Sequence, residues 1–331
     1  MTHTQCVVYL KREYLIGGNN LATLIEDKFK AWEAEAQARF DQLKANEEEL
    51  NKIFIDLYGL QDELDYHVKD SEVSVSLANR EKDIKSLISY AVGCMFGRYS
   101  LDVEGLVYAG GEFDASKYTT FKPVENNLLL VTENQFFDDS SLDIVEKFVE
   151  FVLIVYGKET LEENLQYIAD TLKGTGTSRE VIRRYFVKDF YSNHLQIYKK
   201  RPIYWQFDSG KENGFKGLMY LHRYDANLLG ILRTEYISKL NQAYNGRIEQ
   251  REIEKTMTSN PKDSAKFEKE IQKIHKQIRE LREFDEKIGH LALKKITLDL
   301  DDGVIINYDK LQRDPDDKTK YVILSKGVKE P

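Results

Sequence analysis

Apolar residues recur at steps of three and four along the first long polar stretch of the chain, residues 21–60. This spacing places them on one face of an α-helix, while Glu, Lys, Gln and Asn occupy the other faces. The apolar face is interrupted at Glu47 and otherwise consists of Ile25, Phe29, Trp32, Ala36, Phe40, Leu43, Leu50, Phe54 and Leu57. At 1.5 Å per residue, such a helix is about 60 Å long. A helix of that length usually bridges domains or packs in a helical pair.

A second long periodic stretch is divided by Asn260-Pro261, which predicts a helical hairpin with arms over 226–258 and 263–290. The second arm has the most regular apolar seam in the chain, with Phe284 between its members. That seam consists of Phe267, Ile271, Ile274, Ile278, Leu281, Ile288 and Leu291. Apolar steps of four and three sustained over this length are typical of a coiled coil.

Shorter segments also carry the helical period. We expect helices over 80–96, 159–172 and 179–197, the last of which Pro202 prevents from continuing. A further helix is predicted to end at Tyr156, with a capping box in Ser140-Ser141-Leu142-Asp143.

Strand signals are fewer. The segments 203–207 and 215–221 predict a β-hairpin joined by residues 208–214, and 98–136 is expected to be loop and short strand. A second hairpin is predicted near the C-terminus, pairing 295–300 with 304–308 across Asp301-Asp302-Gly303. The apolar run 6–16 is compatible with a strand. The predicted fold class is α+β and predominantly helical, with long helices, a coiled-coil hairpin and small antiparallel β-hairpins.

These elements suggest three segments. Residues 1–64 form an N-terminal segment and long connector helix, and 65–173 form a mixed helical domain. Residues 174–331 hold the basic and aromatic helix and hairpin, the helical hairpin and the C-terminal β-hairpin. The run Gly174 to Ser178 is the most flexible composition in the chain and marks the last boundary.

Composition narrows the class of protein. The chain has 331 residues and a net charge of −8, so a nucleic-acid-binding role would have to come from a local patch. Its two cysteines, Cys6 and Cys94, are far apart and predict no disulfide framework. No apolar run reaches membrane-spanning length, and the N-terminus lacks the pattern of a signal peptide. We therefore expect a cytoplasmic protein with no membrane partner.

One local patch departs from the acidic total. Residues 179–223 contain ten Lys or Arg and four acids, a net charge of +6, together with ten aromatic residues. Cations interleaved with aromatic rings suit a surface that meets a polyanion. The alternative is an amphipathic helix followed by a hairpin whose rings belong to the core. The candidate DNA-binding residues are Arg183, Arg184, Lys199, Lys200, Arg201, Lys211, Lys216 and Arg223.

No catalytic or metal site is predicted. The six histidines and two cysteines lack the spacing of a structural zinc site. Adenine methylation requires a glycine-rich cofactor loop and an Asn-Pro-Pro-aromatic tetrad, and all five prolines here are isolated. We therefore expect that this chain alone is not an enzyme and binds no cofactor.

Several blocks resemble the C-terminal part of the PglX-like BREX adenine-specific DNA methyltransferases and of the related type IIG restriction-modification enzymes. They occur in the order expected for that family. The blocks are Gln42–Asn51, Ile53–Leu64, Leu87–Asp102, Lys200–Trp205, Asn213–Lys216, His222–Asp225 and Asp299–Tyr308.

The resemblance implies a considerably larger protein, whose catalytic domain and much of whose target-recognition region would lie upstream of Met1. S-adenosylmethionine would be the cofactor of that missing methyltransferase domain. The implied partners are double-stranded DNA, the methyltransferase and recognition domains of the same system, and other phage-defence proteins. The chain would then be a truncated or split product, or an isolated C-terminal region. No catalytic residue carries over, because none of the matching positions is catalytic in the family.

Two hypotheses follow. In the first, the chain is a non-catalytic C-terminal DNA-binding module of an adenine (N6) DNA methyltransferase. If it makes four to six phosphate contacts, its affinity for DNA should fall by roughly two to three orders of magnitude as salt rises from 50 to 200 mM. In the second, the chain is a purely structural module that docks onto the methyltransferase or other subunits of the defence system. Cations gathered on one open face would favour the first, and cations scattered or paired with acids would favour the second. An enzyme in its own right is the weakest alternative.

Overall fold

The computed structural model describes residues 23–328. The chain divides into two compact units, Met1–Tyr90 with Val152–Leu172, and Ala91–Phe151 with Lys173–Pro331. Each unit joins segments that are distant in sequence. The apolar run at residues 6–16 lies outside the described residues.

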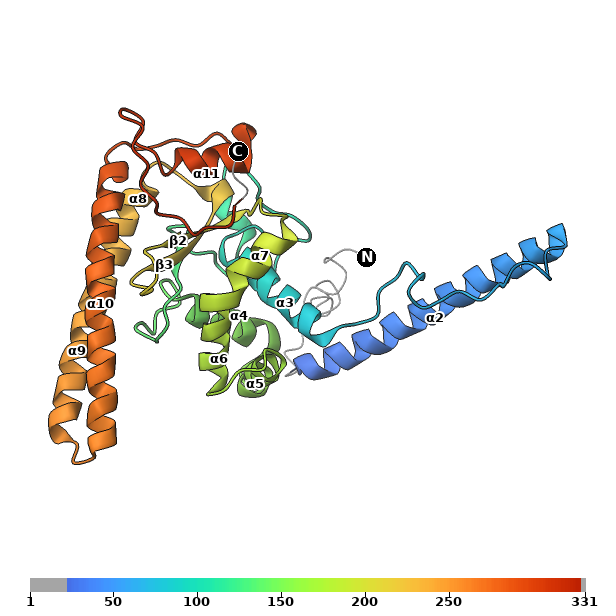
Figure 1. Cartoon of the computed structure of the whole chain (residues 1–331), viewed down its shortest axis with the longest axis horizontal. Helices are drawn as coiled ribbons and strands as arrows, with labels where there is room; N and C mark the ends of the chain where they lie inside the picture. Colours follow the sequence, from blue (N-terminus) through green and yellow to red (C-terminus); the bar gives the residue numbers. More distant parts are fainter. Residues whose placement is uncertain (1–22, 329–331) are drawn as a thin grey trace. The chain divides into compact units, whose positions relative to one another are not determined.

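The first unit is built on α2 (Ile25–Tyr58), which confirms the predicted long helix (Figure 1). In its first half, every residue of the predicted apolar face from Ile25 to Phe40 is buried. The backbone N–H of Ile25 donates to Asn164 Oδ1 at 2.7 Å, which fixes the start of the helix against α5 (Leu161–Thr171). The second half is different, because Leu50 and Leu57 of the predicted apolar face are exposed.

The second unit contains a three-stranded antiparallel sheet of β1 (Leu128–Leu130), β2 (Tyr204–Asp208) and β3 (Lys216–Tyr220) in the order β1-β3-β2. The pairs Trp205 with Met219 and Leu129 with Leu218 set the register. The predicted 203–221 hairpin is confirmed, and the short strand expected within 98–136 adds the third strand.

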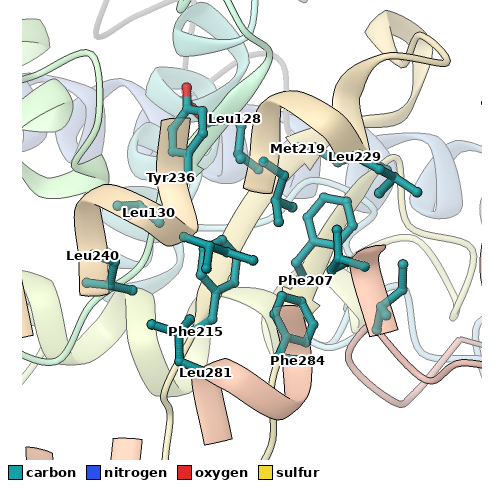
Figure 2. Close-up of a cluster of buried hydrophobic side chains, with 14 of the residues drawn as sticks. Leu128, Leu130, Phe207, Phe215, Met219, Leu229, Tyr236, Leu240, Leu281 and Phe284 are labelled. Carbon is teal, nitrogen blue, oxygen red and sulfur yellow. The ribbon is translucent and has the colours of Figure 1, made fainter. Parts of the chain in front are cut away.

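The predicted helical hairpin is confirmed. Its first arm consists of α8 (Leu228–Ile231), a π-helix (Leu232–Ile237) and α9 (Ser238–Met257), and its second arm is α10 (Pro261–Ala292) (Figure 1). Asn260 caps α10, and Pro261 occupies its first turn, where a missing N–H costs nothing. Figure 2 shows Leu240, Leu281 and Phe284 from the two arms meeting Phe207 and Phe215 of the hairpin region in one apolar core.

The remaining helices are α3 (Arg80–Met95), α4 (Ile144–Tyr156) and a continuous run formed by α6 (Ser178–Tyr185), a π-helix (Phe186–Phe190) and α7 (Tyr191–Ile197). Short 3-10 turns cover Ala115–Lys117 and Leu221–Arg223. The predicted capping box at Ser140 is wrong. Asp143 caps α4 instead, since its Oδ1 accepts from the backbone N–H of Val145 at 2.8 Å and of Glu146 at 3.2 Å.

The predicted C-terminal hairpin is also wrong. A 3-10 turn (Leu300–Asp302) leads into α11 (Gly303–Lys310). Asn307, which is fully buried, donates to the backbone carbonyls of Asp299 and Gly303, and Asp299 accepts from the N–H of Asp301 at 2.9 Å. These side-chain bonds satisfy the backbone in a helical rather than an extended conformation. Within residues 23–328, no helix is both long and apolar enough to cross a membrane.

Candidate nucleic-acid interface

The aromatic residues of the predicted surface belong to the core. Tyr204, Trp205 and Phe207 on β2 are all buried, and the Trp205 indole N–H donates to the carbonyl of Pro202 at 3.2 Å. These rings therefore hold the sheet in place and are not available for stacking with bases.

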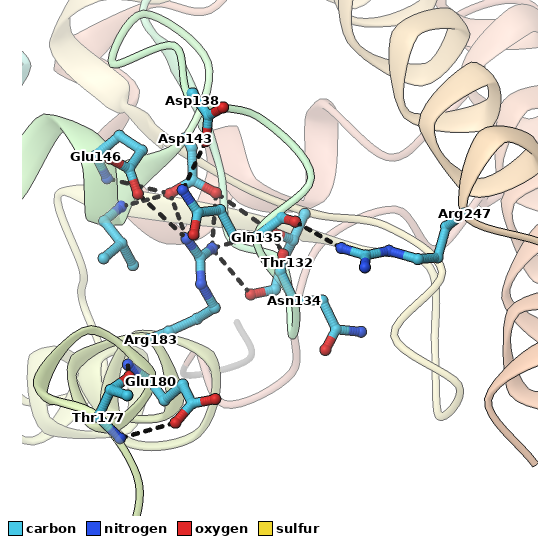
Figure 3. Close-up of polar contacts among 11 residues, drawn as sticks. Thr132, Asn134, Gln135, Asp138, Asp143, Glu146, Thr177, Glu180, Arg183 and Arg247 are labelled. Atoms are coloured by element: carbon cyan, nitrogen blue, oxygen red, sulfur yellow. Dashed lines mark hydrogen bonds and ion pairs between the residues drawn. The ribbon is translucent and has the colours of Figure 1, made fainter. Parts of the chain in front are cut away.

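Arg183 is buried in an ion pair and leaves the candidate surface (Figure 3). Its Nη1 donates to Asp143 Oδ2 at 2.7 Å, and its Nη2 donates to Asp143 Oδ1 at 3.1 Å. The two side chains are 6% and 0% exposed. A bidentate pair of this kind fixes α6 on the start of α4, so the prediction that Arg183 contacts DNA is corrected to a structural role.

The side chain of Arg223 is also engaged in contacts within the protein. Its guanidinium donates to the carbonyls of Phe96 at 3.2 Å, Val124 at 3.0 Å and Glu125 at 3.2 Å, and it stacks on the Phe113 ring with 4.1 Å to the centroid. Burial lowers the pKa of this guanidinium. Arg223 thus holds the loop between α3 and β1, and these contacts give its guanidinium a structural role.

Lys211 and Lys216 lie at the other end of β2 and β3 from the α7–β2 connection, because Lys216 pairs with Asp208 in the sheet. Lys216 Nζ donates to the carbonyl of Val187 at 3.4 Å. Lys211 is 88% exposed but lies 3.7 Å from Glu212. Glu280 binds the same loop, since its carboxylate accepts from the N–H groups of Glu212 at 2.9 Å and Gly214 at 3.0 Å. Acidic groups therefore surround this end of the sheet.

Arg184 is exposed on α6, where its Nη2 donates to the carbonyl of Thr175 at 2.9 Å. This contact ties it to the loop before the helix. It remains accessible, but the structure does not gather it with other candidate cations.

The three remaining candidates, Lys199, Lys200 and Arg201, form the connection between α7 and β2, which we call the basic turn. All three are exposed, and none makes an ion pair with a residue in the part of the chain that the structure describes. Lys199 and Lys200 have φ of 49° and 62°, in the left-handed region that usually selects glycine. The turn is held by backbone bonds, among them Lys200 N–H to the carbonyl of Leu195 at 2.7 Å.

Sequence reasoning missed Arg98, which lies after α3 and is about a hundred residues from the basic turn. Its Nε donates to Tyr99 Oη at 3.3 Å and its Nη1 donates to Tyr220 Oη at 3.0 Å. Tyr198 immediately precedes the basic turn. Burial raises the pKa of Tyr198, and the positive charge of Arg98 offsets part of this rise. No spacing in the sequence connects residue 98 with residue 199.

His194 links the basic turn to the sheet. Its Nε2 accepts from the backbone N–H groups of Ile203 at 3.2 Å and Tyr204 at 3.1 Å. Burial, with a smaller contribution from Arg98, lowers the pKa of His194 to about 3, so the ring is neutral near pH 7. The unprotonated Nε2 is therefore a permanent acceptor that anchors the chain where the turn enters β2.

Comparison of the sequence with those of known proteins identifies its relatives. No family model matches the chain. It is 50% identical over 292 residues, 88% of its length, to "Adenine-specific methyltransferase PglX" of Lacticaseibacillus casei (strain Zhang), of which it covers 24%. It is 36% identical over 300 residues, 82% of its length, to "Adenine-specific methyltransferase BrxX" of Escherichia coli O9:H4 (strain HS), of which it covers 25%. The chain is therefore a PglX-like BREX methyltransferase region that spans about a quarter of the length of these relatives.

Proposed function

We propose that this chain is a non-catalytic C-terminal module that binds duplex DNA through the basic turn, within a cytoplasmic adenine (N6) DNA methyltransferase of a phage-defence system. The methyltransferase domain, with its S-adenosylmethionine, would belong to the rest of the longer protein. The observation that carries the proposal is the basic turn itself. Three consecutive, exposed cations, none of them ion-paired within residues 23–328, stand in a chain whose net charge is −8.

Phosphate binding explains why lysines occupy this turn. Lysine and arginine side chains that neutralise phosphates release condensed counterions from DNA, and this release drives association. Such contacts position a protein on the duplex without reading its sequence. Of the eight predicted cations, the turn holds the three that are adjacent, exposed and free of ion pairs with described residues, so we assign the contact to Lys199, Lys200 and Arg201.

The experiment is a fluorescence-anisotropy titration of a labelled duplex with the parent chain and two variants. The first variant carries Lys199→Gln, Lys200→Gln and Arg201→Gln, and the matched control carries Lys211→Gln and Lys216→Gln. We expect the first variant to bind at least tenfold more weakly and the control to remain within about threefold of the parent. Equal losses in both variants, or none in the first, would contradict the assignment to the basic turn.

A docking role is the second candidate, and one observation favours it. The second half of α2 exposes an apolar face at Leu50, Ile53, Phe54 and Leu57, which are 54%, 54%, 54% and 70% exposed. Contiguous exposed apolar residues commonly mark protein interaction sites. Replacement of Phe54 and Leu57 by Ser should leave DNA binding unchanged if this face serves docking alone.

A further inference from the structure

The charge of Arg98 is not balanced by any acidic side chain among residues 23–328. A guanidinium carries five N–H donors. Two are used, by the hydroxyls of Tyr99 and Tyr220, and the remaining three have no acceptor in the described chain. The carboxylate of Asp102, four residues later in the chain, is engaged elsewhere, since it accepts from the backbone N–H groups of Thr119 at 2.8 Å and Thr120 at 3.0 Å. A half-buried cation in this position favours an anionic ligand.

Aromatic side chains hold Arg98 in place. The guanidinium carbon lies 5.5 Å from the centroid of the Tyr99 ring and 6.0 Å from that of Tyr220. Tyr220 is fixed in turn, because its hydroxyl donates to the carbonyl of Tyr108 at 2.9 Å. The rings stabilise a cation but provide no negative charge. The guanidinium is therefore positioned before any ligand arrives, which lowers the entropic cost of binding.

Two histidines near Arg98 have buried ring nitrogens without partners among the described residues. Because His194 accepts at Nε2, its proton lies on Nδ1, which is buried and has no hydrogen-bond partner in the described part of the chain. The Nδ1 of His222 is likewise buried and unpartnered among these residues. Burial lowers the pKa of both rings, and the charge of Arg98 lowers them further. Both rings are thus within the field of the guanidinium.

We propose that Arg98, supported by Tyr99 and Tyr220 and lying beside Tyr198, is a binding site for a single phosphate group. The inference rests on the proposed function, since the phosphate that the site takes is a phosphodiester of the duplex bound by the basic turn. Arg98 contributes a fixed, planar pair of donors, whereas the lysines of the turn contribute mobile point charges. Arg98 then sets which phosphate is held, and the basic turn strengthens binding around it.

The first test is duplex binding by Arg98→Gln and Arg98→Lys, measured at several salt concentrations. We expect Arg98→Gln to bind about tenfold more weakly and to reduce the slope of log K against log salt by about 0.9, the value for one lost phosphate contact. Arg98→Lys retains the charge and the packing, so the slope should persist while affinity falls several-fold, because the paired donors are lost. Parent-like affinity and slope in both variants would overturn the inference and leave the proposed function intact.

The second test uses inorganic phosphate alone and follows the imidazole signals of His222 by NMR as the pH is varied. His222 faces Arg98 and the ring of Tyr220, whose centroid lies 4.9 Å away, and its carbonyl accepts from Tyr108. A phosphate at Arg98 offsets the positive charge, so the pKa of His222 should rise in the parent. It should not respond in Arg98→Gln, a difference that a merely structural role for Arg98 would not produce.

The outcomes are distinguishable. A phosphate response without duplex binding would support the site and refute the proposed function, and the ligand would then be a free phosphate compound. Duplex binding without any response of His222 to phosphate would overturn the site. Thermal unfolding shows whether Arg98→Gln folds. If it does not, Arg98→Lys tests the site in its place. A parent-like phosphate response in Arg98→Lys, together with undiminished duplex affinity, would exclude the proposed pair of donors.

Discussion

The left-handed lysines of the basic turn allow function and stability to be separated in one variant. Lys199 and Lys200 have φ of 49° and 62°. A non-glycine residue in this region costs about 1–2 kcal/mol. Glycine removes that cost but loses about 0.5–1 kcal/mol more conformational entropy on folding. Because the two changes add, the double variant Lys199→Gly/Lys200→Gly should unfold with a free energy up to about 3 kcal/mol higher than the parent, with a central expectation of about 1.5 kcal/mol.

The same variant should bind DNA less well. If both lysines contact phosphates, the slope of log K against log salt should fall by about 1.8. Urea unfolding gives the stability, and anisotropy with a labelled duplex gives the binding. The matched control is Lys295→Gly, because Lys295 is also an exposed lysine with positive φ, 44°, on another turn. It should gain stability for the same reason and bind DNA within about twofold of the parent.

A stable variant with weakened binding would mean that these lysines are retained for their charge in spite of local strain. The reasoning would be refuted if the double glycine variant bound DNA like the parent. It would also be refuted if this variant lost more than about 1 kcal/mol of stability, since the lysine side chains would then hold the fold.

Three further changes test the surroundings of the interface. Arg183→Met should destabilise the protein by about 3–5 kcal/mol in urea unfolding, because Asp143 would remain buried without its partner. Gly93→Ala should cost about 1–3 kcal/mol and weaken binding of phosphate at Arg98, because the added Cβ would lie 2.3 Å from Cδ2 of Tyr99. His194, with its pKa lowered to about 3, should contribute a loss of stability as pH falls from about 6.5 towards 3, since the unfolded state takes up the proton first. Chemical unfolding at several pH values should show a smaller loss for His194→Gln, which keeps an acceptor for the two N–H groups of β2 but does not titrate.

The sequence was sufficient where the signals were local. Periodicity and turn residues within one segment were enough to predict three elements. These are the long helix α2, the two helical arms that meet at Asn260-Pro261, and the β2–β3 hairpin. The C-terminal hairpin was predicted wrongly because Asp301-Asp302-Gly303 also suits a helix start. The choice between the two depended on the buried side chain of Asn307, whose bonds the pattern could not reveal.

The candidate site was predicted only in part, for a related reason. Charge in the sequence does not distinguish Arg183 from Arg201. One meets Asp143, forty residues earlier in the chain, and the other remains exposed. Arg98 was missed because its bond to Tyr220 on β3 and its electrostatic effect on Tyr198 after α7 depend on tertiary structure. The cations that share a surface could be identified only once their partners were known.

The salt dependence of duplex binding tests the central claim most directly. The three phosphate contacts of the basic turn contribute about −2.7 to the slope of log K against log salt, which by itself corresponds to a loss of affinity of about 40-fold between 50 and 200 mM. The turn alone accounts for fewer contacts than the four to six that the sequence suggested. Arg183 and Arg223 are held by contacts within the protein, and Arg184, Lys211 and Lys216 lie apart from the turn. The slope should become shallower by about 2.7 in the variant with all three cations of the turn replaced by Gln, which leaves the contribution of about 0.9 from Arg98. Binding that does not change with salt, or a slope that is the same in the parent and in this variant, would contradict the account.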